Sequence, residues 1–404
     1  MSRGARGGEL AGPAAMRIAF YAPLKSPTHG TPSGDRRVAG LLLDALQACG
    51  HRVEMVSTFR SLDRDGDAAR QAALRDQGIA LAAQLAAQWQ SGQPIGRPDL
   101  WFTYHLYYKA PDWLGPRLSR LLNIPYVIAE ASHSAKRAGG PWAIGHQACE
   151  DAIRQAALVL CPSRDDIPSI EHLLGSGERV VHLPPFLEPS PYRAARDARD
   201  VHRTSLARQH RVDQGEPWIL AAAMMRPGDK LASYRELAAT LAHLREERWT
   251  LLVAGDGPAR DEVEAVLEGA VPGRIRWLGE LGAAALASTY GACDLLLWPA
   301  VNEAYGMVLL EAQAAGLPVV SCGVRGVPDV VLHQRTGLLV AGGDTRALAE
   351  ATRGLLQDRV RRQQLGAEAA RFVATERSTA VASSHLGGCL ARVMGAERRP
   401  VDGC

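Results

Sequence analysis

The sequence predicts an α/β fold made of two doubly wound domains, and three observations support this prediction. Short apolar runs alternate with longer amphipathic segments along nearly all of the 404 residues, which is the order of strands and helices in a parallel sheet. Most of the runs are continuously apolar, as expected for strands that helices cover on both faces. The alternation stops once, at the proline-rich segment 184–192, and then starts again.

The first half of the chain contains one complete series of these elements. Its strands are expected at 17–22, 52–57, 99–104, 124–129, 157–161 and 179–183. Its helices are expected at 35–48, 67–91, 111–122, 142–156 and 165–174. The order alternates strand and helix from beginning to end, so the first half predicts one doubly wound domain.

The second half repeats the pattern. Its strands are expected at 218–223, 250–254, 274–278, 294–298, 318–321 and 337–340. Its helices are expected at 232–245, 259–268, 283–291, 306–315 and 345–356. The last amphipathic stretch, 361–394, has helical spacing and no further strand, which predicts a terminal pair of helices.

These elements divide the chain into segments. The segments are a disordered tail at 1–15, a first domain at 16–190, an arginine-rich linker at 191–215, a second domain at 216–375 and a C-terminal helix at 376–404 that packs back toward the first domain. The sequence does not indicate an oligomeric state.

Charge and cysteine content exclude several classes of protein. The chain has 46 basic and 43 acidic residues, and this near balance argues against a nucleic-acid binder. Its 7 cysteines show no CxxC spacing, which is typical of reduced thiols in a cytoplasmic protein. No apolar run approaches the roughly 20 residues of a membrane-spanning helix. The arginine-rich stretch 193–211 leaves a peripheral contact with the inner face of a membrane open as an alternative to a solvated linker.

The most informative loop of the second half follows the expected strand at 294–298. Parallel sheets bind ligands at the carboxyl ends of their strands. Here Glu303 precedes a helix and Glu311 lies within it. Between them, the free N–H groups of the helix start offer a seat for a diphosphate, and Gly306 allows close approach of the backbone. The alternative is that Glu303 stabilises the helix dipole and that Glu311 is a surface residue.

Several stretches together resemble the nucleotide-sugar glycosyltransferases of family 4, which have the two-domain GT-B fold. The stretch NEAYGMVLLEAQAAGLPVVSCGVRGVPDVV resembles the E-x7-E region of that family, and TGLLV with the following Gly-Gly-Asp continues it. LLVAGDGPARDEVEAVL and RIRWLGEL resemble its preceding strands and glycine-rich turn. The resemblance implies two Rossmann-like domains facing a central cleft, with the acceptor on the first and the nucleotide sugar on the second.

The resemblance also implies roles for the residues of this region. Glu303 is expected to face the hydroxyls of the donor sugar near the reacting carbon, and Glu311 to accept hydrogen bonds from the ribose. The backbone of residues 305–307, which are Tyr305, Gly306 and Met307, is expected to hold the donor phosphate and sugar. Gly255, in the glycine-rich turn, is expected to adjoin the donor.

A pair of cations binds the donor diphosphate in this family, which suits a group that leaves with growing negative charge. The equivalent stretch, MMRPGDKLASYREL, offers Arg226 and Lys230. The family spacing is one residue longer and would put arginine at Met225 if Lys230 is fixed. The alternative for both cations is an exposed, solvated turn.

In the first domain, the resemblance implies that Gly30, Ser33 and Gly34 form a loop that approaches the diphosphate and the acceptor. His133 matches a family position near the donor sugar. Two further residues are expected to be less directly involved: His105 is interpreted as structural, and Glu130 as a structural or acceptor-side neighbour.

The expected reaction is sugar transfer from a nucleoside diphosphate sugar to an acceptor hydroxyl with retention of configuration, as the resemblance implies. Neither a metal nor another cofactor is expected, and the spacing Asp63–Asp65 is interpreted as a polar connection. Uridine is the expected donor base because it is common in the family, whereas the acceptor is not predicted. An epimerase or phosphorylase with the same fold and a noncatalytic nucleotide-sugar-binding protein remain alternatives.

Overall fold

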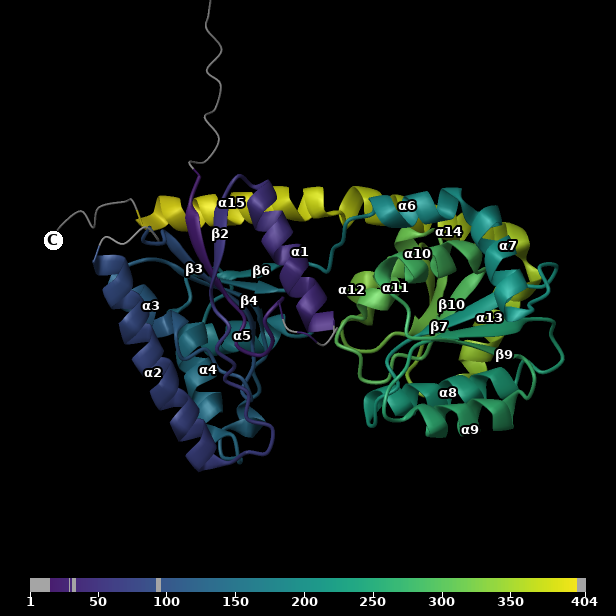
Figure 1. Cartoon of the computed structure of the whole chain (residues 1–404), viewed down its shortest axis with the longest axis horizontal. Coiled ribbons are helices and arrows are strands. Elements are labelled where there is room, and N and C mark those ends of the chain that lie inside the picture. Colours follow the sequence, from purple (N-terminus) through teal and green to yellow (C-terminus); the bar gives the residue numbers. More distant parts are fainter. Residues whose placement is uncertain (1–14, 29, 31–33, 92–95, 398–404) are drawn as a thin grey trace, which may run out of the picture. The chain divides into compact units, whose positions relative to one another are not determined.

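The computed structural model describes residues 15–28, 30, 34–91 and 96–397, and these divide into two compact units (Figure 1). Unit 1 contains the described residues up to Cys161, residues Asp166–Val181 and the described residues from Ala382 onward. Unit 2 contains Pro162–Asp165 and His182–Val381. The tail predicted at 1–15 lies outside the described residues except for Ala15.

Each unit contains one six-stranded sheet. The order in unit 1 is β2-β1-β3-β4-β5-β6, and the order in unit 2 is β12-β11-β10-β7-β8-β9. Neighbouring strands pair in parallel from β2 to β5 and from β12 to β9. The strands of unit 1 are β1 (Arg17–Tyr21), β2 (Arg52–Ser57), β3 (Leu100–Leu106), β4 (Tyr126–Ala131), β5 (Leu158–Cys161) and β6 (Val180–His182). The strands of unit 2 are β7 (Trp218–Ala222), β8 (Thr250–Ala254), β9 (Ile275–Gly279), β10 (Leu295–Trp298), β11 (Val319–Cys322) and β12 (Gly337–Val340). The strands predicted from the apolar runs are thus confirmed.

Helices cover these sheets. Those of unit 1 are α1 (Gly34–Ala48), α2 (Ala68–Gln90), α3 (Gly115–Leu122), the 3₁₀ helix η1 (Ala135–Arg137), α4 (Ala143–Gln155) and α5 (Ile167–Leu174). Those of unit 2 are α6 (Ser190–Asp197), α7 (Arg199–His210), α8 (Asp229–Ala242), α9 (Arg260–Ala270), α10 (Ala283–Ala292), α11 (Met307–Ala314), α12 (Val327–Val330), α13 (Thr345–Gln357) and α14 (Arg359–Glu376). α15 (Thr379–Glu397) begins in unit 2 and continues in unit 1. Its Ser383 hydroxyl donates to the carbonyl of Ala45 in α1 at 2.9 Å.

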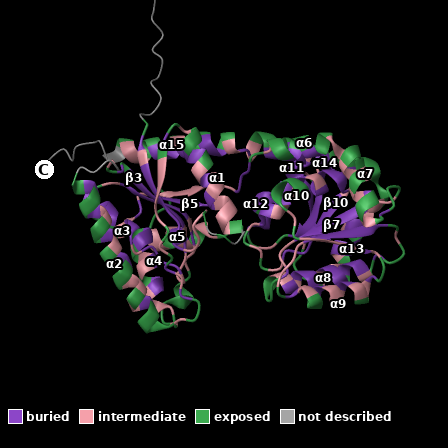
Figure 2. Ribbon diagram, in the orientation of Figure 1, coloured by how far each residue is buried: buried purple, intermediate pink, exposed green. Residues whose placement is uncertain are grey.

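Burial explains the continuous apolar character of the central strands. β11, β10, β7 and β8 are buried along their whole length (Figure 2), because helices cover both faces of the sheet. Large aromatic side chains fill this core, among them Trp218, Trp298 and Tyr234, each with no exposed surface. The ring of Tyr234 meets that of Trp298 edge-on at 5.0 Å. The sheet therefore holds the loops at its carboxyl edge on a rigid support.

Local signals in the sequence set several helix ends. The Asp67 carboxylate accepts from the backbone N–H groups of Ala69 and Arg70 at the start of α2, as a helix-capping side chain does. The end expected for the helix at 306–315 is also confirmed, since α11 ends at Ala314. Gly316 has a left-handed φ of 73°, which suits glycine, and Pro318 leads into β11. The expected polar connection before α2 is present as well, since the buried Asp63 carboxylate accepts from Gly66 N at 3.0 Å.

The segment predicted as a linker, residues 191–215, forms two helices instead. α6 and α7 both pack against α10, and Tyr192 and Ala195 are buried. Two of the arginines that suggested a solvated segment, Arg199 and Arg203 of α7, are part of the packing. The guanidinium of Arg203 donates to the Asp294 carboxylate at 3.0 Å and to the Ala292 carbonyl at 2.9 Å. The prediction was wrong because both helices pack on α10 and α7 has a charge partner, Asp294, from a distant part of the chain.

Two further properties bear on the environment of the protein. None of the described helices is long and apolar enough to cross a membrane. The described cysteines are free thiols, and all of them except Cys49 are buried.

We predict that Asp294→Ala lowers the free energy of unfolding by about 3 kcal/mol, because it leaves two half-buried guanidinium groups without their carboxylate. Those groups belong to Arg199 and Arg203, whose guanidinium nitrogens lie 2.8 and 3.0 Å from the carboxylate oxygens of Asp294. Urea denaturation measures the change. Asp197→Ala is the control, because it removes a carboxylate from an exposed ion pair with Arg196 and should cost less than about 1 kcal/mol. Equal losses in the two variants would contradict the assigned role of Asp294.

Candidate functional site

The second sheet contains a point at which the chain changes its direction of travel. From β7 the chain continues to β8 and β9 on one side, and from β10 it continues to β11 and β12 on the other. The loops that follow β7 and β10 therefore diverge at the carboxyl edge. In open parallel sheets this is the place where ligands bind.

The loop after β10, residues 299–306, has an irregular backbone that is tied to α8. Ala300 and Asn302 adopt left-handed φ values of 59° and 52°, a conformation that is uncommon for residues other than glycine. The Ser233 hydroxyl accepts from Val301 N at 3.0 Å, and the Asn302 amide donates to Asp229 at 2.9 Å. Such strained residues persist only where the surroundings hold them, and they concentrate at functional sites.

Lys230 and Glu303 meet at this point. The Lys230 ammonium, in the first turn of α8, donates a hydrogen bond to Glu303 Oε2 in the loop after β10. Lys230 Nζ also lies 5.7 Å from the centre of the Trp298 ring. The side chains are 33% and 18% exposed, so each retains a surface toward solvent. The structure thus joins the predicted cation and the predicted acid in one ion pair, which the sequence analysis did not anticipate.

Gly306 ends this loop and is packed closely against Glu303. Its φ of 72° is left-handed, and a Cβ at this position would lie 3.2 Å from Cγ of Glu303 and 3.1 Å from the Leu309 side chain. Met307, the first residue of α11, is buried, and Tyr305 is half-buried. The backbone of residues 305–307 therefore lies beside the Lys230–Glu303 pair, at the start of α11.

Glu311 lies inside α11 and is 4% exposed, so the alternative that it is a surface residue was wrong. Its Oε2 accepts a hydrogen bond from the Tyr290 hydroxyl of α10 at 3.0 Å. This contact satisfies part of the hydrogen-bonding capacity of the buried carboxylate and fixes its orientation.

The loops after β7 and β8 are held together by backbone hydrogen bonds. Met225 N donates to Asp256 O at 2.9 Å, and Ala259 N donates to Met225 O at 2.9 Å. A Cβ on Gly255 would lie 1.9 Å from the Ala223 carbonyl, so this position requires glycine. Met225 is buried and Arg226 is exposed. The exposed cation of this turn is therefore Arg226, one position after Met225, where the family spacing would place an arginine.

The first sheet has its own change of direction, between β1 and β3. Gly30 is exposed and Gly34 begins α1, whereas the predicted Ser33 lies outside the described residues. In the first turn of α1, Asp35 accepts a hydrogen bond from His105 Nδ1 at 3.1 Å, and Glu130 Oε1 lies 3.8 Å from the same nitrogen. His105 and Glu130 have left-handed φ values of 60° and 64°. The sequence analysis interpreted His105 as structural and Glu130 as a structural or acceptor-side neighbour, without predicting that they form a cluster.

The charge of His105 follows from this cluster. Burial favours the neutral imidazole, but the carboxylates of Glu130 and Asp35 outweigh it and raise the pKa of His105 to about 9. His105 is therefore a cation near neutral pH that two carboxylates compensate.

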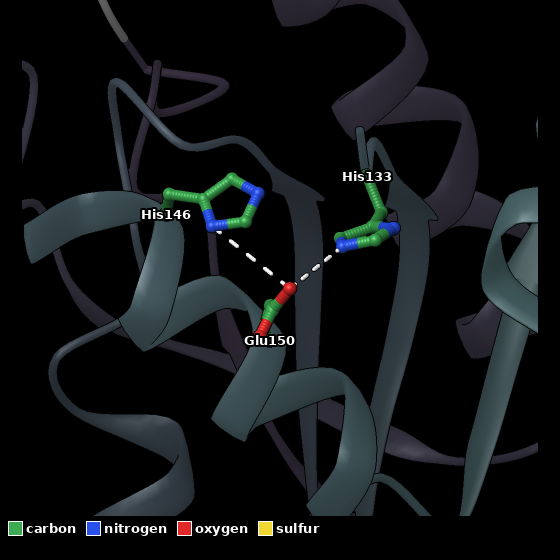
Figure 3. Close-up of side chains that lie close together, drawn as sticks. All are labelled: His133, His146 and Glu150. Carbon is green, nitrogen blue, oxygen red and sulfur yellow. Dashed lines mark hydrogen bonds and ion pairs between the residues drawn. The ribbon is translucent and has the colours of Figure 1, made fainter. Parts of the chain in front are cut away.

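His133 lies after β4 and contacts a carboxylate of α4. Its Nε2 is 2.9 Å from Glu150 Oε1, and its ring lies 5.4 Å from that of His146 (Figure 3). Sequence reasoning missed both His146 and Glu150. Their spacing of four residues within a predicted helix puts them on one face, which was the available signal.

We predict that His105→Asn destabilises the protein more at about pH 6 than at about pH 10. The folded-state pKa lies above the unfolded value of about 6.5, so the stabilisation by the imidazolium is complete below about pH 6.5 and is lost as the pH rises through about 9. Asparagine tolerates the left-handed backbone of this position. Urea denaturation of both proteins at the two pH values measures the effect, and an equal difference at both would contradict it.

Comparisons with known proteins bear on both units. Residues 216–358 match the family model described as Glycosyl transferases group 1. D-inositol 3-phosphate glycosyltransferase of Pseudarthrobacter chlorophenolicus is 28% identical in an alignment of 293 residues that covers 69% of this chain and 67% of that protein. 2-Deoxystreptamine glucosyltransferase of Streptomyces kanamyceticus is 27% identical in an alignment of 256 residues that covers 60% of this chain and 64% of that protein.

A solved structure extends the likeness to nearly the whole chain. Anabaena HepE, crystallised in complex with UDP-glucose, is similar with a TM-score of 0.69 over 93% of this chain and 100% of that chain. At 17% sequence identity, this likeness shows the fold alone. It confirms the predicted class of two Rossmann-like α/β domains.

Proposed function

We propose that this chain transfers a sugar from a nucleoside diphosphate sugar to an acceptor hydroxyl with retention of configuration. The chain is a glycosyltransferase of the GT-B fold, and its residues 216–358 form a group 1 glycosyl transferase domain. The observation that carries the proposal is the Lys230–Glu303 pair, which lies beside Gly306 and the start of α11. A fixed cation and free backbone N–H groups suit a diphosphate, and an adjacent carboxylate suits the hydroxyls of the attached sugar.

The proposed donor is a uridine diphosphate sugar. The crystal structure of HepE with UDP-glucose supports it, since that protein has the same fold. The names of two relatives give a cyclitol phosphate and an aminocyclitol as the compounds they glycosylate, so a polyhydroxylated ring is the proposed class of acceptor. Its free hydroxyl supplies the attacking oxygen.

The reaction builds negative charge on the leaving diphosphate. Lys230, Arg226 and the backbone amides of residues 305–307 are proposed to stabilise that charge, which lowers the barrier without a metal ion. In the structure Lys230 forms an ion pair with Glu303. When a diphosphate binds, the ammonium can donate to phosphate oxygen while Glu303 turns to accept from a sugar hydroxyl.

Retention is proposed to follow attack from the face that the diphosphate leaves. The bond from the anomeric carbon to the phosphate oxygen breaks, and a bond from that carbon to the acceptor oxygen forms. The acceptor proton moves to an oxygen of the departing phosphate. The carboxylate of Glu303 forms an ion pair with Lys230, which suits hydrogen bonding and charge support better than nucleophilic attack.

A cytoplasmic location is part of the proposal. The free thiols of the described cysteines support it, because oxidising compartments favour disulfides. Peripheral contact with a membrane remains a further hypothesis, for which α7 is the candidate element through its exposed Val201.

We expect Glu303→Gln to reduce turnover roughly 100-fold, because the neutral amide cannot support positive charge on the reacting sugar. The assay measures nucleoside diphosphate released from UDP-glucose with and without a panel of cyclitol acceptors. Acceptor-dependent release separates transfer from epimerisation and from binding without catalysis. Glu262→Gln is the matched control, because Glu262 forms an exposed ion pair with Arg235 on the same unit. Unchanged turnover in Glu303→Gln would remove Glu303 from the catalytic residues.

We expect Lys230→Ala to weaken binding of UDP about 10- to 100-fold and to leave binding of uridine unchanged, because a charged hydrogen bond to phosphate contributes about 1.5–3 kcal/mol. Isothermal titration calorimetry with the two ligands measures this split. Arg235→Ala removes a cation from the same helix and should change neither affinity. An equal loss of affinity for uridine and UDP would argue against contact with the diphosphate.

A further inference from the structure

Two histidines and one glutamate meet within unit 1, at the loop after β4 and on α4 (Figure 3). Glu150 Oε1 lies 2.9 Å from His133 Nε2 and 3.9 Å from His146 Nδ1, and one ligand-type atom of each residue lies within 4.8 Å of those of the other two. The side chains of the histidines are 7% and 4% exposed, and that of Glu150 is 16% exposed. The three groups therefore converge on a point that is largely shielded from solvent.

The local structure explains this convergence. His146 and Glu150 are four positions apart in α4, which places them on one face of the helix. The start of the helix is held in place, because a Cβ on Gly145 would lie 2.1 Å from the Tyr108 carbonyl. The loop after β4 brings the His133 ring against the same face. Close packing thus fixes the backbone that carries the three side chains.

Hydrogen bonds on the outer side of the cluster orient two of its members. Nε2 of His146 lies 3.0 Å from the Ser134 carbonyl, and a carbonyl only accepts hydrogen bonds, so this nitrogen carries a proton. Oε2 of Glu150 accepts from Arg154 at 3.2 Å. The ring of His146 and the carboxylate of Glu150 therefore turn their remaining atoms, Nδ1 and Oε1, toward one another (Figure 3).

This arrangement is unfavourable unless a positive charge lies between the two atoms. A neutral imidazole with its proton on Nε2 presents a lone pair at Nδ1, and that lone pair faces a carboxylate oxygen of Glu150 at 3.9 Å. The distance is too long for a direct hydrogen bond. It suits two ligands of one metal ion, since bonds of about 2.0–2.2 Å to a zinc ion place neighbouring ligands about 3–4 Å apart.

A hydrogen-bonded pair of His133 and Glu150 without a metal ion accounts for less of the geometry. It explains the contact of 2.9 Å but not the approach of His146 Nδ1 to the same oxygen. The buried Nδ1 of His133 does not distinguish the two arrangements. It has no hydrogen-bond partner among the residues that the structure describes, whether it carries a proton or a lone pair. The orientation of His146 therefore favours the metal site.

We infer that His133 Nε2, His146 Nδ1 and Glu150 Oε1 bind one divalent metal ion, and that Zn²⁺ is the ion this set of donors favours. Two imidazoles and one carboxylate are a ligand set that zinc takes, with its fourth position left to solvent. The Ser134 carbonyl and Arg154 support two of these ligands from behind, as groups around metal sites usually do. The ion ties the loop after β4 to α4. The site uses residues of unit 1 alone, so the inference goes beyond the proposed transfer reaction and does not depend on it.

Metal binding by the full chain tests the inference. The protein is treated with a chelator, desalted and titrated with Zn²⁺ in a calorimeter, and a parallel titration with Co²⁺ records the absorption spectrum. We expect one equivalent of either ion per chain and a midpoint of thermal unfolding that rises with the zinc concentration. The cobalt spectrum should contain no thiolate charge-transfer band, because the site has no cysteine ligand.

His146→Gln and Glu150→Gln each remove one ligand with little change in shape. Glutamine at position 146 can still donate to the Ser134 carbonyl. We expect the affinity for zinc to fall at least about 100-fold in each variant, because loss of a group that only supports a ligand already costs about 10- to 100-fold. Asp151→Asn and His172→Gln are the matched controls. They remove a carboxylate from the next position of α4 and an exposed histidine from α5, and they should leave the affinity unchanged.

Two results would overturn the inference. One is a wild-type chain that binds neither ion, in which case the positive charge between His146 and Glu150 is a proton. The other is zinc binding that is equally tight in both glutamine variants, or a cobalt spectrum with a thiolate band, either of which would place the ion elsewhere. If a variant does not fold, the titrations and the cobalt spectrum of the wild type still decide. None of these measurements uses a sugar donor, so they stand apart from any failure of the proposed function.

Discussion

The parallel sheet of unit 2 determines where charge can gather, because all of its strands end at the same edge. Between β7 and β10 the chain turns toward opposite sides of the sheet, so the segments that follow these strands diverge. Lys230 comes from one of them and Glu303 from the other, 73 positions later. The contact between them depends on two buried strands that hold the loops in register, and Trp298 at the end of β10 packs beneath the ammonium.

Residues with a strained backbone lie at the carboxyl edge of each of the two sheets. Ala300 and Asn302 follow β10, and His105 and Glu130 lie at the ends of β3 and β4, all with left-handed φ values. Each of these conformations costs about 1–3 kcal/mol. In unit 2, close packing below this edge can hold such conformations, since β7 and β10 are buried from end to end. The strained residues in turn aim polar side chains at positions that a regular strand would not reach.

The sequence was sufficient to predict the strands, because a continuous apolar run between polar turns has few alternatives in a chain of this composition. It was insufficient for the helices α6 and α7, because Arg199 and Arg203 of α7 are paired with Asp294, more than 90 residues away. The pairing of His133 with Glu150 was beyond sequence reasoning for the same reason, since a loop and a helix must first be packed together. Residues that follow a strand end, such as Lys230 after β7 and Glu303 after β10, were accessible to prediction, whereas the contact between them required the fold.

The buried thiols have a practical consequence for the chemistry of the molecule. Burial raises the pKa of Cys161 to about 12 and of Cys322 to about 11, and it raises that of Cys149 and Cys293 still further. A thiol must lose its proton before it attacks an electrophile or a peroxide. These sulfur atoms therefore resist alkylation and oxidation while the chain is folded, and their reaction with a thiol-specific dye reports on opening of the sheets.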